Sequence, residues 1–162
     1  MRVLDTAALL HWPVERCRGG IVAISQQDEL LRVDEQRSLL MESASLDWQV
    51  PLQSALQQAR EIASETGDLP RLSPVDLDVL ALAIDLNLPL VTDDYRMKNV
   101  ARKAGISVEG VLTSGGKKQW KWILRCIGCR AEEDVPPSAK QSKKDDVQLC
   151  DRCGSPMKLK KG

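Results

Sequence analysis

Two short apolar runs of the sequence each end in aspartate, a residue type that can hold a divalent cation. Residues 2–4 are followed by Asp5, and residues 88–91 lead through one threonine to Asp93 and Asp94. Each run has the composition of a buried strand, and each acidic end is followed by a helical pattern. Ligands of open α/β sheets bind at the carboxyl ends of the strands. We therefore expect these acids to share one edge of a sheet and to form a divalent-metal site there.

A third aspartate, Asp76, stands on the apolar face of a predicted helix. Ser73-Pro74 is an N-cap followed by proline at the first helical position. At about 100° per residue, Asp78 and Asp85 share the face that we expect to meet solvent, whereas Asp76 falls among apolar residues. An acid there is costly unless it is paired or bound to metal. Capping of the first turn is the alternative, but it does not explain why this face is the buried one, so we favour metal binding.

Four cysteines near the carboxyl end form two C-x-x-C pairs, Cys126 with Cys129 and Cys150 with Cys153, separated by twenty residues. This is close to the spacing of a zinc ribbon, in which two such pairs complete the tetrahedral shell of one structural Zn²⁺. Iron is the rival metal. A segment of about forty residues cannot build a sufficient core by itself, so the metal should be required for its folding.

Two tryptophans alternate with basic residues just before the first cysteine pair. Trp120 and Trp122 stand among Lys117, Lys118, Lys121 and Arg125. This interleaving suits RNA, because bases stack on aromatic rings and phosphates pair with lysine or arginine. The alternative is that one or both rings fasten the cysteine segment to the rest of the protein. The sequence favours neither interpretation.

The elements that must position these residues alternate between strand-like and helical patterns. This alternation indicates an α/β fold, a parallel sheet with helices on both faces. The expected strands are residues 2–4, 21–24, 48–52, 88–91 and 106–112. The expected helices are residues 6–10, a helix capped by Ser25, residues 34–44, residues 54–65 with Gly67 behind them, a helix that begins at Pro74, and one that stops at Gly105.

The size and charge of the chain limit its class. Its 162 residues, 43% of them hydrophobic, suit one domain with a small appendage. Residues 1–113 carry 11 basic and 17 acidic side chains, whereas residues 114–162 carry 12 and 6. An acidic body with a basic tail is typical of a metal-dependent site joined to a nucleic-acid-binding module. The sequence has neither an apolar stretch of ~20 residues nor a signal-peptide pattern, so we expect a cytoplasmic protein without a membrane partner.

The order and surroundings of four acids resemble those of the PIN-domain nucleases. The matching stretches are Val3–Thr6, Glu29–Leu30 at the start of a helix, Leu72–Ala83 and Thr92–Asp94. Two further stretches, Asp93–Ala101 and Ile123–Cys129, are similar to the Nob-type endonucleases, a narrower family with a zinc ribbon. The resemblance covers essentially the whole chain.

This resemblance implies a PIN nuclease domain over residues 1–113, a basic linker over 114–122 and a zinc ribbon over 123–162. The implied activity is an endonuclease for single-stranded RNA that depends on Mn²⁺ or Mg²⁺ and matures the 3′ end of small-subunit rRNA. Its partners would be the rRNA precursor and the small ribosomal subunit. Assembly-factor proteins and a second copy of the chain are further candidates.

The resemblance also implies a role for each acid. The catalytic set would be Asp5, Glu29, Asp76 and Asp94, in which the three aspartates hold the metal directly or through water and Glu29 supports them. Asp93 would assist next to Asp94. The match around Glu29 is poor, so the neighbouring Asp28 could replace it.

Three other functions remain open from the sequence. The first is a toxin-type PIN ribonuclease acting on tRNA or mRNA, against which the fused ribbon and basic linker argue. The second is a non-catalytic RNA-binding assembly factor, against which the presence of all four acids argues. The third is a nuclease for DNA, which charge alone does not exclude.

Overall fold

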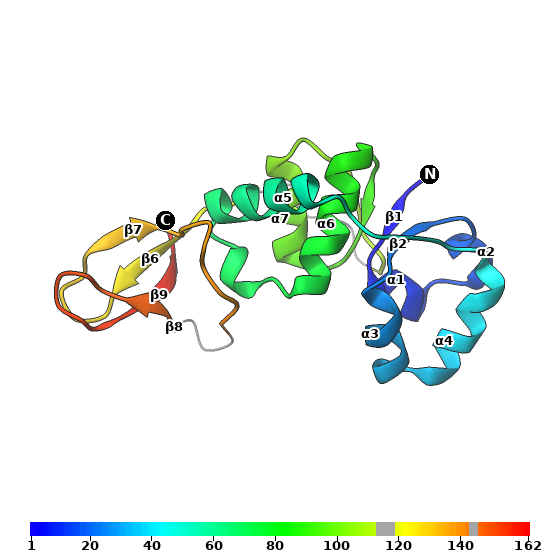
Figure 1. Cartoon of the computed structure of the whole chain (residues 1–162), viewed down its shortest axis with the longest axis horizontal. Coiled ribbons are helices and arrows are strands. Elements are labelled where there is room, and N and C mark those ends of the chain that lie inside the picture. The colour runs from blue at the N-terminus through cyan, green and yellow to red at the C-terminus, as the bar shows by residue number, and fades with distance from the viewer. Residues whose placement is uncertain (113–118, 143–145) are drawn as a thin grey trace.

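A five-stranded parallel sheet forms the centre of the larger part of the protein. The computed structural model describes residues 1–112, 119–142 and 146–162 (Figure 1). The strand order is β3-β2-β1-β4-β5, and every neighbouring pair is parallel. The strands are β1 (Val3–Leu4), β2 (Ile21–Ala23), β3 (Asp47–Gln49), β4 (Leu90–Val91) and β5 (Val108–Glu109). Four of them lie within the predicted strand regions, whereas β3 begins at Asp47, one residue before its predicted region, and all five are shorter than expected.

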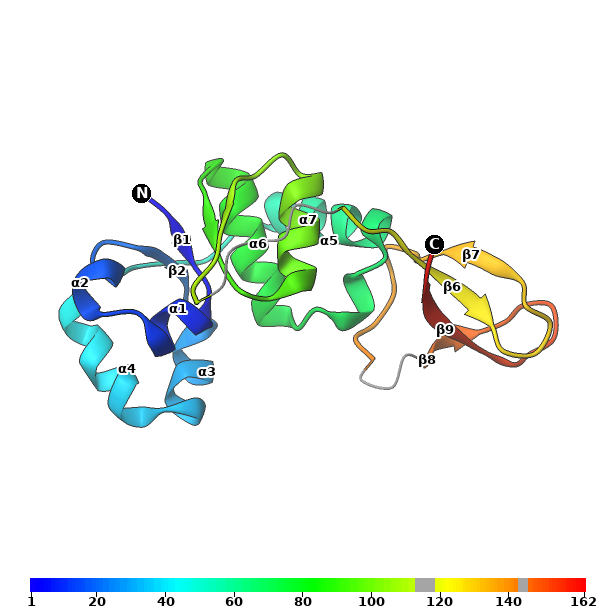
Figure 2. The same cartoon turned by 180° about the vertical axis from the view of Figure 1, so that it is seen from behind.

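Helices cover both faces of this sheet. Successive residues of a strand point to opposite faces, and accordingly Val3 and Leu90 join one apolar core whereas Leu4 and Val91 join another. The first core is closed by α5 (Gln53–Thr66), α6 (Pro74–Leu86) and α7 (Tyr95–Lys103). The second is closed by α1 (Thr6–His11), α2 (Val14–Cys17), α3 (Gln26–Val33) and α4 (Glu35–Met41) (Figure 2). This is the predicted α/β, PIN-like arrangement.

Local sequence signals set several helix ends as predicted. Ser73 caps α6, and its hydroxyl accepts from the Asp76 amide while the Asp76 carboxylate accepts from the Ser73 amide. Gly67 ends α5 with φ +80°, a backbone conformation that glycine adopts at little cost. Short 3₁₀ turns follow α4 (Glu42–Ala44) and α5 (Leu69–Arg71).

Two local expectations were wrong. Ser25 stands before α3, but its backbone is helical (φ −60°, ψ −18°) and its side chain makes no capping bond. Its hydroxyl instead donates to Oδ2 of Asp78 at 2.8 Å. Asp78 is half-buried rather than directed to solvent, because it accepts this hydrogen bond from the residue just before α3.

A second, antiparallel sheet of four strands holds the cysteines. Its order is β7-β6-β9-β8, with strands β6 (Trp122–Cys126), β7 (Glu132–Asp134), β8 (Asp146–Leu149) and β9 (Pro156–Lys161). We call this part, residues 122–162, the ribbon and residues 1–112 the body. Residues 114–118 of the predicted basic linker, Lys117 and Lys118 among them, lie outside the described residues.

The ribbon and the body share one apolar core. Leu124, Val135 and Met157 of the ribbon belong to the same buried cluster as Ala59 and Ala63 of α5. Backbone hydrogen bonds join the two parts as well: the Ser142 amide donates to the Pro70 carbonyl at 2.7 Å. Asn99 of α7 accepts from the Trp120 amide at 2.8 Å and donates to the Trp120 carbonyl at 2.9 Å. The segment around Trp120 therefore helps to fasten the ribbon.

Among the described residues, no helix has both the length and the apolarity to cross a lipid bilayer.

Gly67 offers a test of the contact between body and ribbon. A Cβ at Gly67 would lie 1.9 Å from the Trp122 carbonyl oxygen, whereas a Cβ at Gly105, which has a similar φ of +79°, meets nothing within 4 Å. Gly67→Ala should therefore destabilise the protein by about 3 kcal/mol, and Gly105→Ala by about 1 kcal/mol from backbone strain alone. Hydrogen exchange of the Ser142 amide should accelerate in Gly67→Ala only. Equal effects of the two substitutions would mean that Gly67 serves only as the end of α5.

Candidate active site and metal centre

Three aspartates from three elements converge at one edge of the parallel sheet. Asp5 follows β1 and Asp94 follows β4, and these two strands are neighbours, so their carboxyl ends meet. Asp76 comes from the first turn of α6, which packs against β1 and β2. The negative charges of Asp76 and Asp94 each raise the pKa of Asp5. The sequence expectation that the acids share one edge of the sheet is thus met.

Asp5 is the most buried of these acids. Its residue is only 8% exposed, and its two oxygens accept from the Thr92 hydroxyl at 2.7 Å and from the Thr6 amide at 2.8 Å. Burial raises the pKa of Asp5 to about 7, with Asp76 and Asp94 adding to the rise while the two hydrogen bonds oppose it. A carboxylate in this setting is stabilised by a cation, because a cation offsets both the lost hydration and the repulsion.

Asp76 combines the two roles that the sequence left open. Its Oδ2 accepts from the Ser73 amide at 2.9 Å, which is the capping role. Burial raises the pKa of Asp76, and the charges of Asp94 and Glu29 contribute to the rise. The same side chain therefore caps α6 and belongs to the acid cluster.

The two adjacent aspartates after β4 point to different partners. Asp94 is the N-cap of α7, and its Oδ1 accepts from the Arg96 amide at 2.8 Å. Asp93 accepts instead from the amides of Val111 and Leu112, at 2.8 and 2.9 Å. Asp94 is thus the one whose charge acts on Asp5 and Asp76, whereas Asp93 ties down the chain beyond β5.

Glu29 reaches the cluster through Thr6. The Thr6 hydroxyl donates to Oε2 of Glu29 at 2.8 Å and accepts from the Gln26 side chain at 3.2 Å. Glu29 is half-buried, whereas the alternative residue Asp28 is exposed.

Sequence reasoning missed three polar residues that orient these acids: Thr6, Gln26 and Thr92. Thr92 links two of the aspartates, because its hydroxyl donates to Asp5 and accepts from the Asp94 amide at 3.0 Å. The buried Gln26 donates to the Leu4 carbonyl at 3.0 Å and accepts from the Ala23 amide at 2.7 Å, which joins β1 to β2. Thr6 and Thr92 stand within two residues of an acid, a signal that the sequence did contain.

The acid cluster suits a hard divalent cation. It offers only carboxylate oxygens and hydroxyls, the donors that Mg²⁺ and Mn²⁺ prefer. Among the described residues, the four cysteines are the one group whose potential ligand atoms all lie within 4.8 Å of one another, so the carboxylates are spread more widely. Mg²⁺ usually keeps several of its waters when it binds to proteins, and a spread set of acids is compatible with such partly hydrated binding.

The four cysteines of the ribbon converge on one point. Sγ of Cys126 lies 3.3 Å from Sγ of Cys153, and Sγ of Cys129 lies 3.7 Å from Sγ of Cys150. The amides of Gly128 and Cys129 point at Sγ of Cys126, at 3.3 and 3.4 Å. Hydrogen bonds from Ser155 lower the pKa of Cys153 to about 6, which favours the thiolate at that position, whereas desolvation and hydrogen bonds with the other three cysteines raise the pKa of Cys129. Tetrahedral coordination by four thiolates fits this geometry.

Cys17 is remote from this cluster. It is buried in the second apolar core of the body, and its Sγ lies 3.6 Å from the Ala8 carbonyl oxygen.

Comparisons with known proteins identify the family. A family model described as the PIN domain of ribonuclease matches residues 3–86. Endoribonuclease Nob1 of Pyrococcus abyssi is 37% identical over a region that covers 78% of this chain and 75% of that protein. The chain belongs to the Nob1 family of PIN-domain endoribonucleases. Endoribonuclease Nob1 of Methanocaldococcus jannaschii is 32% identical over 99% of this chain and 77% of that protein, so the likeness includes the ribbon.

A shorter likeness extends to another group of ribonucleases. Ribonuclease VapC1 of Thermoplasma acidophilum is 38% identical over 64% of this chain and 48% of that protein. This likeness covers a smaller share of both proteins than the likeness to the Nob1 relatives does.

The raised pKa of Asp5 leads to a pH-dependent stability of the metal-free protein. The folded state holds a proton on Asp5 up to about pH 7, whereas the unfolded chain loses it near the ordinary aspartate pKa of 3.8. The folded state therefore binds more protons in this window, and its free energy of unfolding should fall as the pH rises through it, by about 4 kcal/mol at most. Thermal unfolding in EDTA should show this decline in the wild type and a smaller one in Asp5→Asn. Saturating Mg²⁺ at pH 7.5 should reverse most of the decline, and parallel pH profiles of the two proteins would contradict the role of Asp5.

The ribbon should require its metal for folding. Cys126→Ser removes one of the four converging thiolates and should lower the metal content from one ion per chain to less than half. The ribbon amides, such as that of Leu124, should then exchange rapidly, because so small a sheet lacks a sufficient core of its own. Cys17→Ser is the matched control and should keep the full metal content by elemental analysis. A metal content unchanged in Cys126→Ser would rule out the four-thiolate site.

Proposed function

We propose that this protein is a metal-dependent endonuclease for single-stranded RNA that cleaves precursor small-subunit rRNA at its 3′ end. The observation that carries the proposal is the convergence of Asp5, Asp76 and Asp94, whose charges act on one another at the edge of the sheet. Burying like charges together is costly unless a cation joins them. The Nob1 relatives, named endoribonucleases, support RNA as the substrate.

The acids have different roles in this proposal, three of them as metal ligands and the others in support. Asp5, Asp76 and Asp94 hold Mg²⁺ or Mn²⁺, directly or through water, and Glu29 supports them from its hydrogen bond to Thr6. A divalent ion bound there supplies a water of lowered pKa and stabilises the charge that develops on the phosphate. Thr92 keeps Asp5 and Asp94 oriented by bonding to both. Asp93 acts as a positioning residue, because it holds the backbone beyond β5.

The ribbon distinguishes this function from the alternatives. A PIN ribonuclease of toxin type, acting on tRNA or mRNA, is the alternative, but the likeness to ribonuclease VapC1 covers only 64% of this chain and 48% of that protein. The likeness to Nob1 of Methanocaldococcus jannaschii covers 99%. In our proposal one structural Zn²⁺ holds the ribbon, and the ribbon helps to grip the rRNA precursor on the small ribosomal subunit. Assembly-factor proteins and a second copy of the chain would be further partners there.

Cleavage of a defined RNA tests the proposal. The substrate spans the 3′ end of small-subunit rRNA and its downstream spacer, and Mn²⁺, Mg²⁺ and EDTA are compared. We expect one metal-dependent cut at the mature end. Asp94→Asn should slow it by at least about 100-fold, because a metal-holding charge is lost. Affinity for the RNA should be kept or improved, since asparagine also caps helices well and one repulsion with phosphate is removed.

Asp85→Asn is the matched control, because it removes the same charge from an exposed site on α6. It should cleave like the wild type. Scattered cuts would retain the nuclease but contradict the rRNA assignment. Binding without any cut, in all three metal conditions, would favour a non-catalytic assembly factor.

A further inference from the structure

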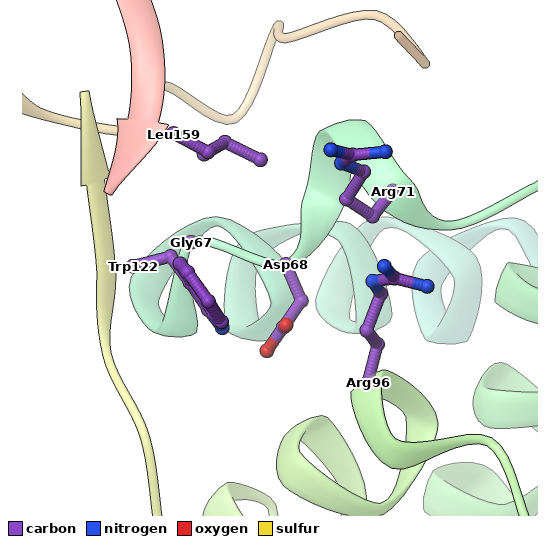
Figure 3. A pocket seen from close by; sticks show the side chains of 6 residues that line it. All are labelled: Gly67, Asp68, Arg71, Arg96, Trp122 and Leu159. Carbon is purple, nitrogen blue, oxygen red and sulfur yellow. The ribbon is translucent and has the colours of Figure 1, made fainter. Parts of the chain in front are cut away.

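A pocket lies where the ribbon meets the body. Its volume is about 170 Å³, and Figure 3 shows its lining of Gly67, Asp68, Arg71, Arg96, Trp122 and Leu159. Pockets for drug-sized ligands span about 300–1,000 Å³, so this one suits a smaller group such as a single base. Gly67, Asp68, Arg71 and Arg96 come from the body, whereas Trp122 and Leu159 come from β6 and β9 of the ribbon.

One side of the pocket is positively charged. Arg71 and Arg96 place their guanidinium groups on the same side of the pocket (Figure 3). Burial and the charge of Arg96 both lower the pKa of Arg71, so the two cations act on each other. Asp68 attracts Arg96, but it is 1% exposed and its Oδ2 already accepts from Asn99 at 2.6 Å. Guanidinium groups match phosphate well in charge and geometry, so a wall that carries two of them suits a phosphate.

The opposite side of the pocket is apolar. The indole of Trp122 and the side chain of Leu159 face the pocket from the ribbon (Figure 3). Trp122 is only half-buried, although its backbone carbonyl packs closely against Gly67. An exposed aromatic face beside a cationic wall is the combination that single-stranded nucleic acids require, since the base stacks while the phosphate pairs.

The pocket also lies close to the acid cluster. Arg96 is in the first turn of α7, which Asp94 caps through the Arg96 amide at 2.8 Å. The charge of Asp94 acts on Asp68 at the floor of the pocket. A strand whose phosphate lies at the acids can therefore reach the pocket within a short length of chain.

We propose that this pocket binds one nucleotide of the RNA strand near the scissile phosphate, with Arg71 and Arg96 on its phosphate and Trp122 on its base. This inference rests on the proposed function, because it assumes an RNA strand at the acids. The pocket exists only when the ribbon is docked, because Trp122 and Leu159 form one of its walls. The ribbon thus completes the substrate site and sets the position of the cut relative to the captured base.

The first test measures binding apart from cleavage. Full-length protein carrying Asp94→Asn is titrated onto fluorescent RNA that spans the 3′ end of small-subunit rRNA, at several salt concentrations. Adding Arg71→Gln and Arg96→Gln should weaken binding, and the slope of log K against log salt should fall by about 0.7 for one lost phosphate contact. Arg32→Gln, which removes one exposed charge from α3, is the matched control and should leave the slope unchanged. An unaltered slope in the double variant would overturn the proposal.

The second test locates the base. A series of RNAs, each with one abasic nucleotide at a different position, is cleaved by protein without the Asp94→Asn substitution. In the wild type, one position at a fixed distance from the cut should reduce the rate about 10-fold, as expected for a lost stacking partner. Trp122→Leu should cleave intact RNA more slowly than the wild type, and the abasic site at that position should not lower its rate further. Trp122→Phe should keep the wild-type pattern.

The outcomes separate this inference from the proposed function. If the wild type cuts the RNA but no abasic position is sensitive to Trp122, the pocket proposal fails while the nuclease stands. If the wild type does not cut at all, the proposed function fails, and the salt slope still decides whether the arginines hold phosphate. Adenosine monophosphate is also tested as a competitor of the RNA. If it binds as tightly as the RNA but does not displace it, the protein has a site for free nucleotides and the proposal is overturned.

Discussion

The structure depends on three like charges held within reach of one another at the edge of the parallel sheet. Because β1 and β4 are neighbours, Asp5 and Asp94 emerge side by side, and α6 brings Asp76 to the same place. Burial, together with the charges of Asp76 and Asp94, raises the pKa of Asp5 to about 7, which corresponds to roughly 4 kcal/mol of unfavourable free energy for its ionised form. The fold holds the acids in this arrangement because every one of them is anchored by hydrogen bonds to backbone or to threonine. This electrostatic cost is the reason that the site should bind a cation readily.

The acids are fixed largely by the same devices that end the strands and begin the helices. Asp94 caps α7, Asp76 closes the capping box of α6, and Asp5 accepts from the first amide of α1. When a carboxylate caps a helix, backbone amides fix the position of one of its oxygens and thereby the orientation of the whole group. The local folding of each segment therefore positions its acid before any tertiary contact is considered, while the order of the strands brings the segments together.

This division explains how far the sequence could predict the site. Strand ends, the Ser73-Pro74 cap and the cysteine spacing are local patterns, and each led to the correct element for Asp5, Asp76, Asp94 and the ribbon. The Thr92–Asp94 motif favoured Asp94 over Asp93, but the partners of Asp93 were not local, since they are the amides of Val111 and Leu112 beyond β5. The bond from Ser25 to Asp78 likewise joins elements 53 positions apart, and capping rules alone gave the wrong result for it.

The pocket between body and ribbon is the feature that local sequence patterns were least able to predict. Trp122 was recognised in the sequence, yet the arginines that line the pocket with it come from a 3₁₀ turn and from α7, and no spacing pattern connects them. What connects them is the docking of the ribbon, which the absence of a side chain at Gly67 permits. A metal that folds the ribbon would therefore affect substrate selection from a distance. Without its metal-bound cysteine pairs the ribbon would not hold Trp122 and Leu159 in place to contact a base. In our proposal the metal of the ribbon and the acids of the body serve the same strand of RNA: the metal fixes where the strand lies, and the acids fix where it is cut.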